Sequence, residues 1–443
     1  MRPLPVLPVL LFAALASCGR EPAASAPPAS PPPADPMALE KSVAEISAEV
    51  ARLRGLRFEH PVPAGIRTPG QFLAYFRRVV GEEFPPEKLA FYQDAYELFG
   101  FLEPGTDLLS AFEALLKASV GGFYDYRWDK AFYTITTFQT GAFGKVVMAH
   151  ELCHALEDQH FDLGALAESV RGKSDRAFAF SAVMEGSATL VMNAWLAGMT
   201  AGGPGSLPAS AGRDLTQGME TERRAFLAAA RRAPPFLVAT LNLPYLLGPP
   251  FLAGNPPGSS GPADPGALEH AFRDPPRSSE QILHREKFWD PARRDDPVWV
   301  DLPDLSPALG AGWSLAGNDV LGELGLFFLL ALPIPDATAP GAAQASWTSP
   351  GAAGWGGDRF QLYRGPGGAR VLLLAVVWDR AADRAEFLHE FRAKKPGQRI
   401  GFREAFPSTR DPRFLLVILA DGKGVQDAPR IRSALLENDS RWQ

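Results

Sequence analysis

Cysteine and histidine are scarce in this sequence, and basic residues do not exceed acidic ones. Its 443 residues include two cysteines, Cys18 and Cys153, so at most one disulfide can form and no disulfide framework supports the fold. Lys and Arg number 44 against 50 Asp and Glu, and the net charge of −6 argues against a basic nucleic-acid-binding surface. Hydrophobic residues make up 46% of the chain, which excludes disorder along its whole length. We therefore expect a sizeable core and no nucleic-acid partner.

Long hydrophobic runs are also missing from the body of the chain. The most apolar segment, Val320 to Leu332, is too short to cross a membrane and contains Glu323. The start of the chain differs, because Arg2 is followed by an apolar run from Leu4 to Ala16 and then by small residues. This pattern predicts a signal peptide over residues 1–17.

The end of that segment, Leu15-Ala16-Ser17-Cys18, resembles the lipobox of bacterial lipoproteins. The resemblance implies cleavage before Cys18 and acylation of its thiol and new amino group, with palmitate as a typical chain. Residues 18–36 would then form a lipidated, Pro/Ala/Ser-rich tether. Gly19, in place of an aspartate, favours the outer membrane. We expect a protein anchored in the bacterial cell envelope by an N-terminal lipid; the alternative is an ordinary secretory signal with a chance cysteine.

The rest of the sequence predicts a predominantly helical α+β fold. We expect an N-terminal helical section over 37–120, a catalytic region over 121–336 and a C-terminal α+β accessory domain over 337–443. Residues 248–266 are rich in Gly, Pro and Ser and predict an exposed loop. The expected helices are Met37–Leu53, Pro69–Phe84, Lys88–Phe99, Leu108–Val120, Phe143–Gln159, Asp175–Leu196, Leu215–Arg232, Phe236–Leu247, Ser278–His284, Val320–Leu332, Asp383–Lys394 and Pro429–Leu436, and the expected strands are Ala131–Phe138, Phe360–Tyr363, Val371–Trp378 and Phe414–Leu419.

One motif carries recognisable chemistry: His150-Glu151-Leu152-Cys153-His154 fits the pattern H-E-x-x-H. At about 100° per residue, the two histidines lie one turn apart on one face of a helix, so both can bind a single zinc ion. Glu151 lies to one side of this pair, where it suits a base that takes a proton from water. Cys153 also lies off the face of the pair, and we expect it to be a buried apolar residue.

An open catalytic zinc site takes three protein ligands, so the motif needs a third. Glu185 lies 31 residues after His154 (185 − 154), in the next long helix that we expect. With the motif, it resembles the gluzincin branch of zinc metallopeptidases, in which a glutamate on a following helix completes a His-His-Glu site. The resemblance implies one zinc ion per chain, bound by His150, His154 and Glu185, and it implies Glu151 as the catalytic residue.

The resemblance extends beyond this triad to an uncharacterised group of prokaryotic extracellular and lipoprotein zincin-like proteins. Four segments carry it: GFYDY and HALEDQHFDL around the motif, PPRSSEQILHREKF at Pro275–Phe288, and GWGGDRFQLY at Gly354–Tyr363. It implies a zincin-like core over most of the mature chain. Glu157 stands where this group often has glutamine. The two outlying segments contain no residue pattern to which we assign a chemical role.

Two residues on the expected helices are candidates for supporting the ligands. Asp158 and Thr189 each lie four residues after a ligand, His154 and Glu185 respectively, so their side chains could hydrogen-bond near the metal. Ordinary positions on a helix surface are the alternative for both.

Other residues could act on the substrate. His284 could stabilise an oxyanion, as could Tyr133 or Tyr245, although histidine and tyrosine more often have structural roles. The strand expected at Ala131–Phe138 is either an edge on which an extended peptide lies or an ordinary core strand.

These features predict a membrane-anchored zinc metallopeptidase, a hydrolase that acts on a peptide or protein substrate. Two alternatives stay open. One is a noncatalytic envelope-binding or scaffold lipoprotein with a structural or decayed metal site. The other is a hydrolase of nonpeptide amides, such as those of cell-wall material. The oligomeric state and the cleavage preference have no signal in the sequence.

Overall fold

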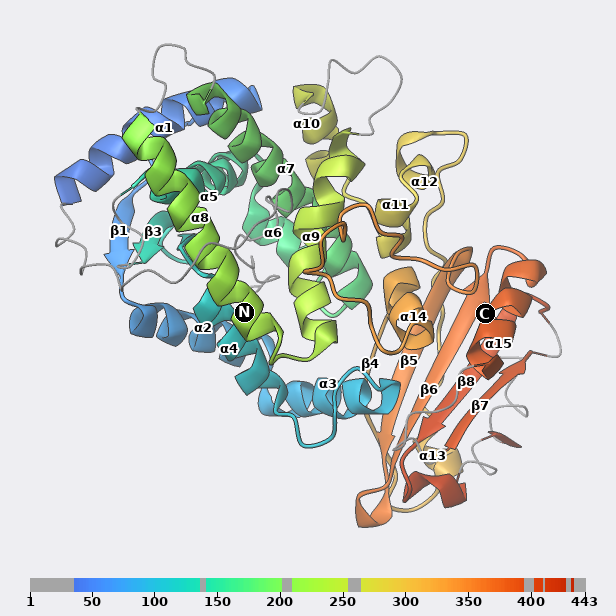
Figure 1. The fold of residues 1–443 in the computed structure, drawn as a ribbon. Helices are drawn as coiled ribbons and strands as arrows, with labels where there is room; N and C mark the ends of the chain where they lie inside the picture. Colours follow the sequence, from blue (N-terminus) through green and yellow to red (C-terminus); the bar gives the residue numbers. More distant parts are fainter. Residues whose placement is uncertain are drawn as a thin grey trace.

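The fold is predominantly helical α+β with two sheets, as the sequence predicts (Figure 1). The computed structural model describes residues 36–135, 141–200, 209–253, 264–393, 402–408, 411–427 and 432–433. The expected signal peptide, Cys18 and the tether up to residue 35 lie outside these residues, as does nearly all of the helix expected at Pro429–Leu436.

The N-terminal section contains the four expected helices: α1 (Pro36–Arg54), α2 (Pro69–Glu83), α3 (Pro86–Phe99) and α4 (Leu108–Ser119). Local sequence explains where α2 begins, because Thr68 and Gln71 form a capping box and Pro69 occupies the first turn. The expectation of a purely helical section was wrong, because β1 (Ala64–Arg67) lies between α1 and α2. This four-residue strand has no alternating pattern, and it forms by pairing with a distant strand.

A three-stranded sheet lies beside these helices, in the order β1-β3-β2. Strand β2 (Gly122–Asp125) pairs antiparallel with β3 (Ala131–Ile135), which pairs parallel with β1 on its other side. Because β3 is paired on both sides over these residues, it cannot offer an edge to a peptide. The described part of the strand expected at Ala131–Phe138 is therefore a core strand, the second of the two readings.

Five helices follow: α5 (Ala142–Phe161), α6 (Leu163–Ser169), α7 (Ser174–Thr200), α8 (Ala209–Ala230) and α9 (Pro235–Ala253). The prediction of a loop from residue 248 was wrong, because α9 continues through Gly248 and two prolines. A Cβ atom on Gly186 of α7 would lie 2.5 Å from the carbonyl carbon of Gly248, so the two helix backbones touch there. Tertiary packing extends this helix against its local composition.

Helix α9 is also long and apolar enough to cross a membrane by length and composition alone. However, 78% of the residues in its most apolar window are buried inside the structure. It packs against α7 along its length (Figure 1). This burial is typical of a core helix.

The chain then passes through short elements to a second sheet. These elements are α10 (Pro265–Arg273), α11 (Ser279–Leu283), α12 (Glu286–Trp289), α13 (Ser306–Leu309), β4 (Ser314–Asp319) and α14 (Gly322–Leu330). The sheet is antiparallel in the order β4-β5-β6-β8-β7, formed with β5 (Trp355–Arg364), β6 (Arg370–Trp378), β7 (Phe402–Pro407) and β8 (Phe414–Ala420), and α15 (Ala381–Ala393) packs on it.

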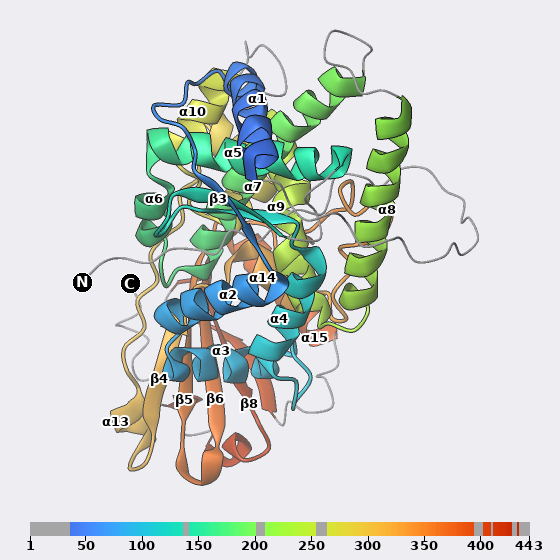
Figure 2. The ribbon, with the colours of Figure 1, turned by 90° about the vertical axis from the view of Figure 1, so that its left-hand side faces the viewer.

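The boundary predicted at residue 337 divides this sheet, because β4 belongs to it and lies earlier in the chain. The sheet also shares a hydrophobic core with the helical body. The ring of Phe91 on α3 stacks on Phe360 of β5 with centroids 5.7 Å apart, and Figure 2 shows α3 lying across the strands. Both faces of β6 are covered, which agrees with its continuous apolar sequence.

Candidate metal centre

The three predicted ligands meet between two packed helices. His150 and His154 come from α5, and Glu185 comes from α7. His150 Nε2 lies 3.0 Å from Glu185 Oε2, His154 Nε2 lies 3.5 Å from the same oxygen, and the two Nε2 atoms are 3.1 Å apart. All three side chains are buried. The structure therefore brings together residues that are 35 positions apart in the chain.

These spacings suit a tetrahedral zinc ion. Ligands at Zn–N and Zn–O distances of about 2.0–2.1 Å are separated by roughly 3.3–3.4 Å along an edge of a tetrahedron. The three measured separations, 3.0, 3.1 and 3.5 Å, lie close to that value. Two imidazoles and one carboxylate are also a common set of protein ligands for catalytic zinc. Both the geometry and the chemistry of the donors fit the ion.

The charges within the triad are strongly coupled. Burial disfavours a protonated His154, but the carboxylates of Glu185 and Glu151 outweigh burial and raise its pKa to about 9. For Glu185, burial is outweighed by the positive charge on His154, and the pKa falls to about 2. Burial lowers the pKa of His150 to about 4. Glu185 is thus a carboxylate and His150 a neutral imidazole, as metal ligands must be, and a divalent cation would compete with one proton on His154.

Glu151 is held beside the triad by the backbone of the small sheet. Its Oε2 accepts a hydrogen bond of 2.9 Å from the amide N–H of Tyr124 in β2. Its Oε1 is buried and has no hydrogen-bond partner among the described residues. Burial raises the pKa of Glu151 to about 8. One oxygen is therefore fixed in place and the other has no partner, and a divalent cation at the triad would favour the carboxylate form that can accept a proton.

A cavity of about 300 Å³ reaches the triad at Glu185, while His150, His154 and Glu151 do not line it. Glu185 and Tyr245 line it at that end, and the Tyr245 ring lies over the His150 imidazole with centroids 5.9 Å apart and planes 26° apart. Among the three predicted oxyanion candidates, Tyr245 is the one whose ring stacks on a proposed metal ligand. Tyr133 instead donates a hydrogen bond to Asp129 at 2.6 Å.

The two residues expected to support the ligands do not contact them. The Asp158 carboxylate accepts hydrogen bonds from the Tyr124 hydroxyl, the Lys130 ammonium and the Leu163 amide, so it joins the end of α5 to the sheet. Thr189 is buried, and its hydroxyl has no partner in the described part of the chain. The Nδ1 atoms of both histidines likewise have none there. A four-residue spacing on a helix was therefore not enough to predict the hydrogen-bond partners of Asp158 and Thr189.

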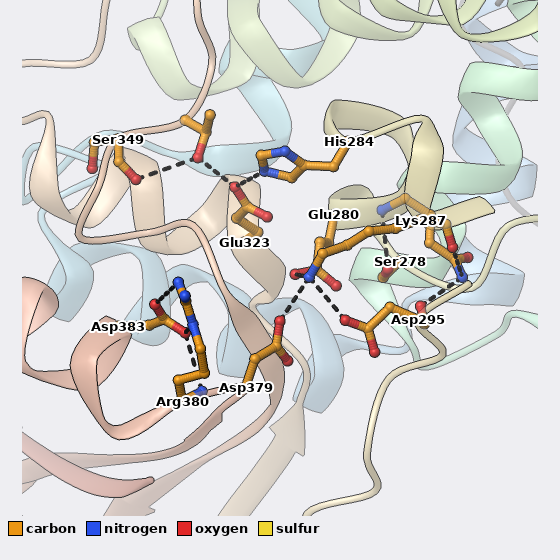
Figure 3. A network of polar contacts seen from close by, with 12 residues as sticks. Ser278, Glu280, His284, Lys287, Asp295, Glu323, Ser349, Asp379, Arg380 and Asp383 are labelled. Atoms are coloured by element: carbon orange, nitrogen blue, oxygen red, sulfur yellow. Dashed lines mark hydrogen bonds and ion pairs between the residues drawn. The ribbon is translucent and has the colours of Figure 1, made fainter. Parts of the chain in front are cut away.

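His284 lies in a different polar network, shown in Figure 3. Its Nε2 lies 2.9 Å from Glu323 Oε1, which also accepts a hydrogen bond from the Thr348 hydroxyl. No contact joins His284 to the triad, and it does not line the cavity. The structure thus supports the structural role for His284 rather than the proposed oxyanion role.

The same network contains a second cluster of acidic residues. Glu280, Asp295 and Asp379 bring carboxylate oxygens within 4.8 Å of one another. The ammonium group of Lys287 lies among them, 2.6, 2.8 and 2.7 Å from the three carboxylates (Figure 3). A cation of the protein itself therefore occupies this cluster. The segment Pro275–Phe288, which had no assigned role, here joins the helical body to the second sheet.

Two features of the site escaped sequence analysis. The first is the Tyr124 amide that holds Glu151, since a backbone contact leaves no trace in residue type. The second is Arg54, which is fully buried and donates a hydrogen bond of 2.7 Å from Nε to Glu157. A glutamate on an otherwise buried helix signals that a counter-charge is needed. The sequence does not say which basic residue supplies it.

Comparison with known proteins covers only the second sheet. A family model described as a domain of unknown function (DUF8575) matches residues 313–411. No curated protein and no solved structure matches the chain. The matched region begins next to β4 and ends before β8, so it covers four of the five strands of the second sheet and does not include the triad.

Proposed function

We propose that this protein is a zinc-dependent hydrolase of amide bonds, with peptides or proteins as the leading substrate class. The observation that carries the proposal is the convergence of His150, His154 and Glu185 with donor atoms 3.0–3.5 Å apart. Independent support comes from Glu151, whose carboxylate is held beside them with one oxygen available. The lipobox-like sequence at Cys18 further suggests that the protein works from an anchored position in the bacterial cell envelope.

In the proposed reaction, the triad binds the metal ion and Glu151 transfers the proton. Zinc bound by the triad would polarise a carbonyl group and lower the pKa of a water molecule toward about 7. Glu151 would accept a proton from this water at Oε1, while the Tyr124 amide keeps its other oxygen in place. The protonated Glu151 would then return the proton to the leaving nitrogen. The side chains of the triad and of Glu151 are buried, so their charges interact more strongly than they would at an exposed site.

The test combines metal analysis with one conservative substitution. Purified mature protein should contain one zinc ion per chain and should cleave members of a library of peptides and other amides. Glu151→Gln should keep the zinc but lose about 10²–10⁴-fold in turnover, because it removes the proton acceptor and retains the shape. Glu40→Gln, at an exposed position on α1, is the matched control and should leave both properties unchanged.

The alternatives give different results in the same experiment. One tightly bound zinc with no cleavage of any amide would support the noncatalytic envelope-binding or scaffold protein and contradict the hydrolase. Cleavage of nonpeptide amides without cleavage of ordinary peptides would narrow the substrate class. Turnover that survives Glu151→Gln would show that the base has been assigned incorrectly.

A further inference from the structure

One wall of the cavity that reaches Glu185 is formed by one face of α7 and one face of α9. On α7, its lining residues recur at three- and four-residue steps from Ser174 to Glu185, so they form one face of the helix. On α9, the lining residues run from Phe236 to Tyr245 in a similar stripe. The other wall is made by apolar residues of the N-terminal helices, including Phe76, Phe84, Leu89, Leu108 and Phe112.

Two sets of contacts show that the cavity is elongated. At one end, the Tyr92 hydroxyl lies 3.4 Å from Ser174 Oγ, and the rings of Tyr96 and Phe236 have centroids 4.7 Å apart. At the other end, Gly186 of α7 touches Gly248 of α9. The two helices therefore run side by side in the same direction. Ser174 and Glu185 are eleven positions apart on α7 (185 − 174), which corresponds to about 16 Å of helix.

The polar groups of the lining are concentrated at the two ends. Lys88, Lys173 and Ser174 lie at the α3 end, and Glu185 and Tyr245 lie at the triad end. Between them the lining is mainly Ala, Phe and Leu, and its polar side chains are Ser181 on α7 and Thr240 on α9. The Thr240 hydroxyl, which is also in the middle, already donates a hydrogen bond to Phe236 O within its own helix.

This distribution distinguishes between two kinds of occupant. An extended peptide about 16 Å long would contain about five residues, each with a backbone N–H and C=O that require partners. The middle of the cavity offers few partners, so burying such a peptide there would be costly. A hydrocarbon chain has no groups of this kind, and it gains from contact with the apolar walls.

We propose that this cavity holds the hydrocarbon chain of a fatty-acyl amide, with the acyl carbonyl next to Glu185 and the chain along α7 and α9, facing the N-terminal helices. This inference rests on the proposed hydrolase and names its substrate class. In the reaction, the amide C–N bond breaks, the hydroxyl of water joins the acyl carbon and its proton joins the leaving nitrogen. The products are a fatty acid and an amine. The amine part lies outside the cavity and belongs to either a peptide or a lipid.

Binding without turnover tests the cavity separately from catalysis. Mature protein with Glu151→Gln would be titrated with N-acyl glycines and N-acyl ethanolamines of increasing chain length. Each added methylene should improve the Kd by about fourfold until the cavity is filled, and then the gain should stop. A Kd that does not depend on chain length would overturn the proposal.

Blocking the cavity gives the second arm of the test. Ala177 lines the cavity one helical turn from Ser174, near the α3 end, so Ala177→Trp should weaken binding of the longest chains at least tenfold and leave short chains unaffected. Ala382→Trp, at an exposed position on α15, is the matched control. Ala177→Met is a milder blocking variant, and it should shorten the preferred chain if the tryptophan variant does not fold. Unchanged preference in a folded blocking variant would contradict the assignment.

The results also separate the two proposals. Chain-length-dependent binding with no zinc-dependent cleavage would support the cavity and contradict the hydrolase. Zinc- and Glu151-dependent cleavage that ignores chain length would support the hydrolase and overturn the fatty-acyl assignment. Where both hold, the ratio of kcat/KM for acyl glycines and acyl ethanolamines identifies the amine part of the substrate as peptide-like or lipid-like.

Discussion

The described part of the chain contains two clusters of three potential metal ligands, and they differ in how their charge is balanced. His150, His154 and Glu185 form one cluster, while Glu280, Asp295 and Asp379 form the other. In both, the donor atoms lie within 4.8 Å of one another. The acidic cluster surrounds the ammonium group of Lys287, whereas no Lys or Arg side chain of the described chain makes an ion pair with the triad.

The difference shows that proximity of ligands alone does not indicate a metal site. Three carboxylates repel one another unless a cation lies among them, and Lys287 meets that need permanently. In the triad, the carboxylate of Glu185 is instead balanced by a proton on His154, whose pKa the neighbouring carboxylates raise. A proton can be displaced by a divalent cation, but a lysine tethered to the chain cannot leave. This contrast explains why only the triad supports the proposed zinc chemistry.

The sharpest test of the contrast removes one ligand from each cluster. His154→Ala should weaken zinc affinity by more than about 100-fold, because mutation of residues that only hydrogen-bond to metal ligands already costs 10–100-fold. The purified variant should therefore no longer contain one zinc ion per chain. Asp295→Asn, in the acidic cluster, should leave the zinc content unchanged. Metal analysis and competition with a chromophoric chelator measure both. Equal losses in the two variants would remove the distinction between the clusters.

A buried ion pair on α5 extends the comparison to stability. Glu157 lies one turn after His154, and it pairs with Arg54, whose guanidinium also lies 5.7 and 5.6 Å from the centres of the Phe161 and Phe272 rings. Arg54→Met should reduce the free energy of unfolding by about 4 kcal/mol, because it leaves a buried carboxylate without a counter-charge. Urea unfolding measures this change.

Two controls accompany that variant. Adding Glu157→Gln to Arg54→Met should restore most of the lost stability, since the remaining amide carries no charge. Arg52→Met, at an exposed salt bridge on the same helix, should change the free energy of unfolding by less than about 1 kcal/mol. If Arg54→Met behaves like Arg52→Met, the buried pair does not have the role described.

Removing the ammonium group of Lys287 should leave the three carboxylates of the acidic cluster without a counter-charge. Lys287→Met is expected to cost about 3 kcal/mol, less than the change at Arg54 because Asp295 and Asp379 are partly exposed. Calcium at millimolar concentration should restore part of the stability, because the three carboxylates can then share an oxygen-seeking cation. Thermal unfolding with and without calcium measures the effect, and Lys41→Met at an exposed site is the control. No response to calcium would show that the cluster cannot accept a metal.

A buried acid near the same junction should make the free energy of unfolding depend on pH. Burial raises the pKa of Asp175 to about 7 from its ordinary 3.8. The folded state therefore binds more protons than the unfolded state between about pH 4 and 7. The stabilisation that comes from the extra proton on Asp175 is complete below pH 4 and is lost as the pH rises through 7. Over this interval the free energy of unfolding should fall by up to about 1.4 kcal/mol per pH unit.

Asp175→Asn should flatten this dependence. Asparagine resembles the protonated acid, and it can still accept the hydrogen bond from the Ser279 amide. Asp301→Asn, at an exposed position, should leave the slope as it is in the natural protein. Urea unfolding at a series of pH values measures all three proteins. Parallel slopes for Asp175→Asn and the natural protein would contradict the assigned cause.

Much of the secondary structure could be predicted because its signals are local. Helices α1 to α5 and α7 follow from apolar periodicity and from caps such as Thr68, and the apolar runs of β6 and β8 predict buried strands. Strands β1, β4 and β7 were missed, since each is short or polar and forms by pairing with a distant strand. The same reason explains the misplaced boundary at 337.

For the site, residue types and helical spacing were sufficient to nominate His150, Glu151, His154 and Glu185. A four-residue step on a helix has only one geometry, so the relation between the two histidines is encoded locally. The tertiary structure alone decided that α7 places Glu185 against them, that β2 holds Glu151, and that His284 and Asp158 point elsewhere. It also created the cavity that α7 and α9 form with the N-terminal helices, because the distance between packed helices depends on side chains that are remote in sequence.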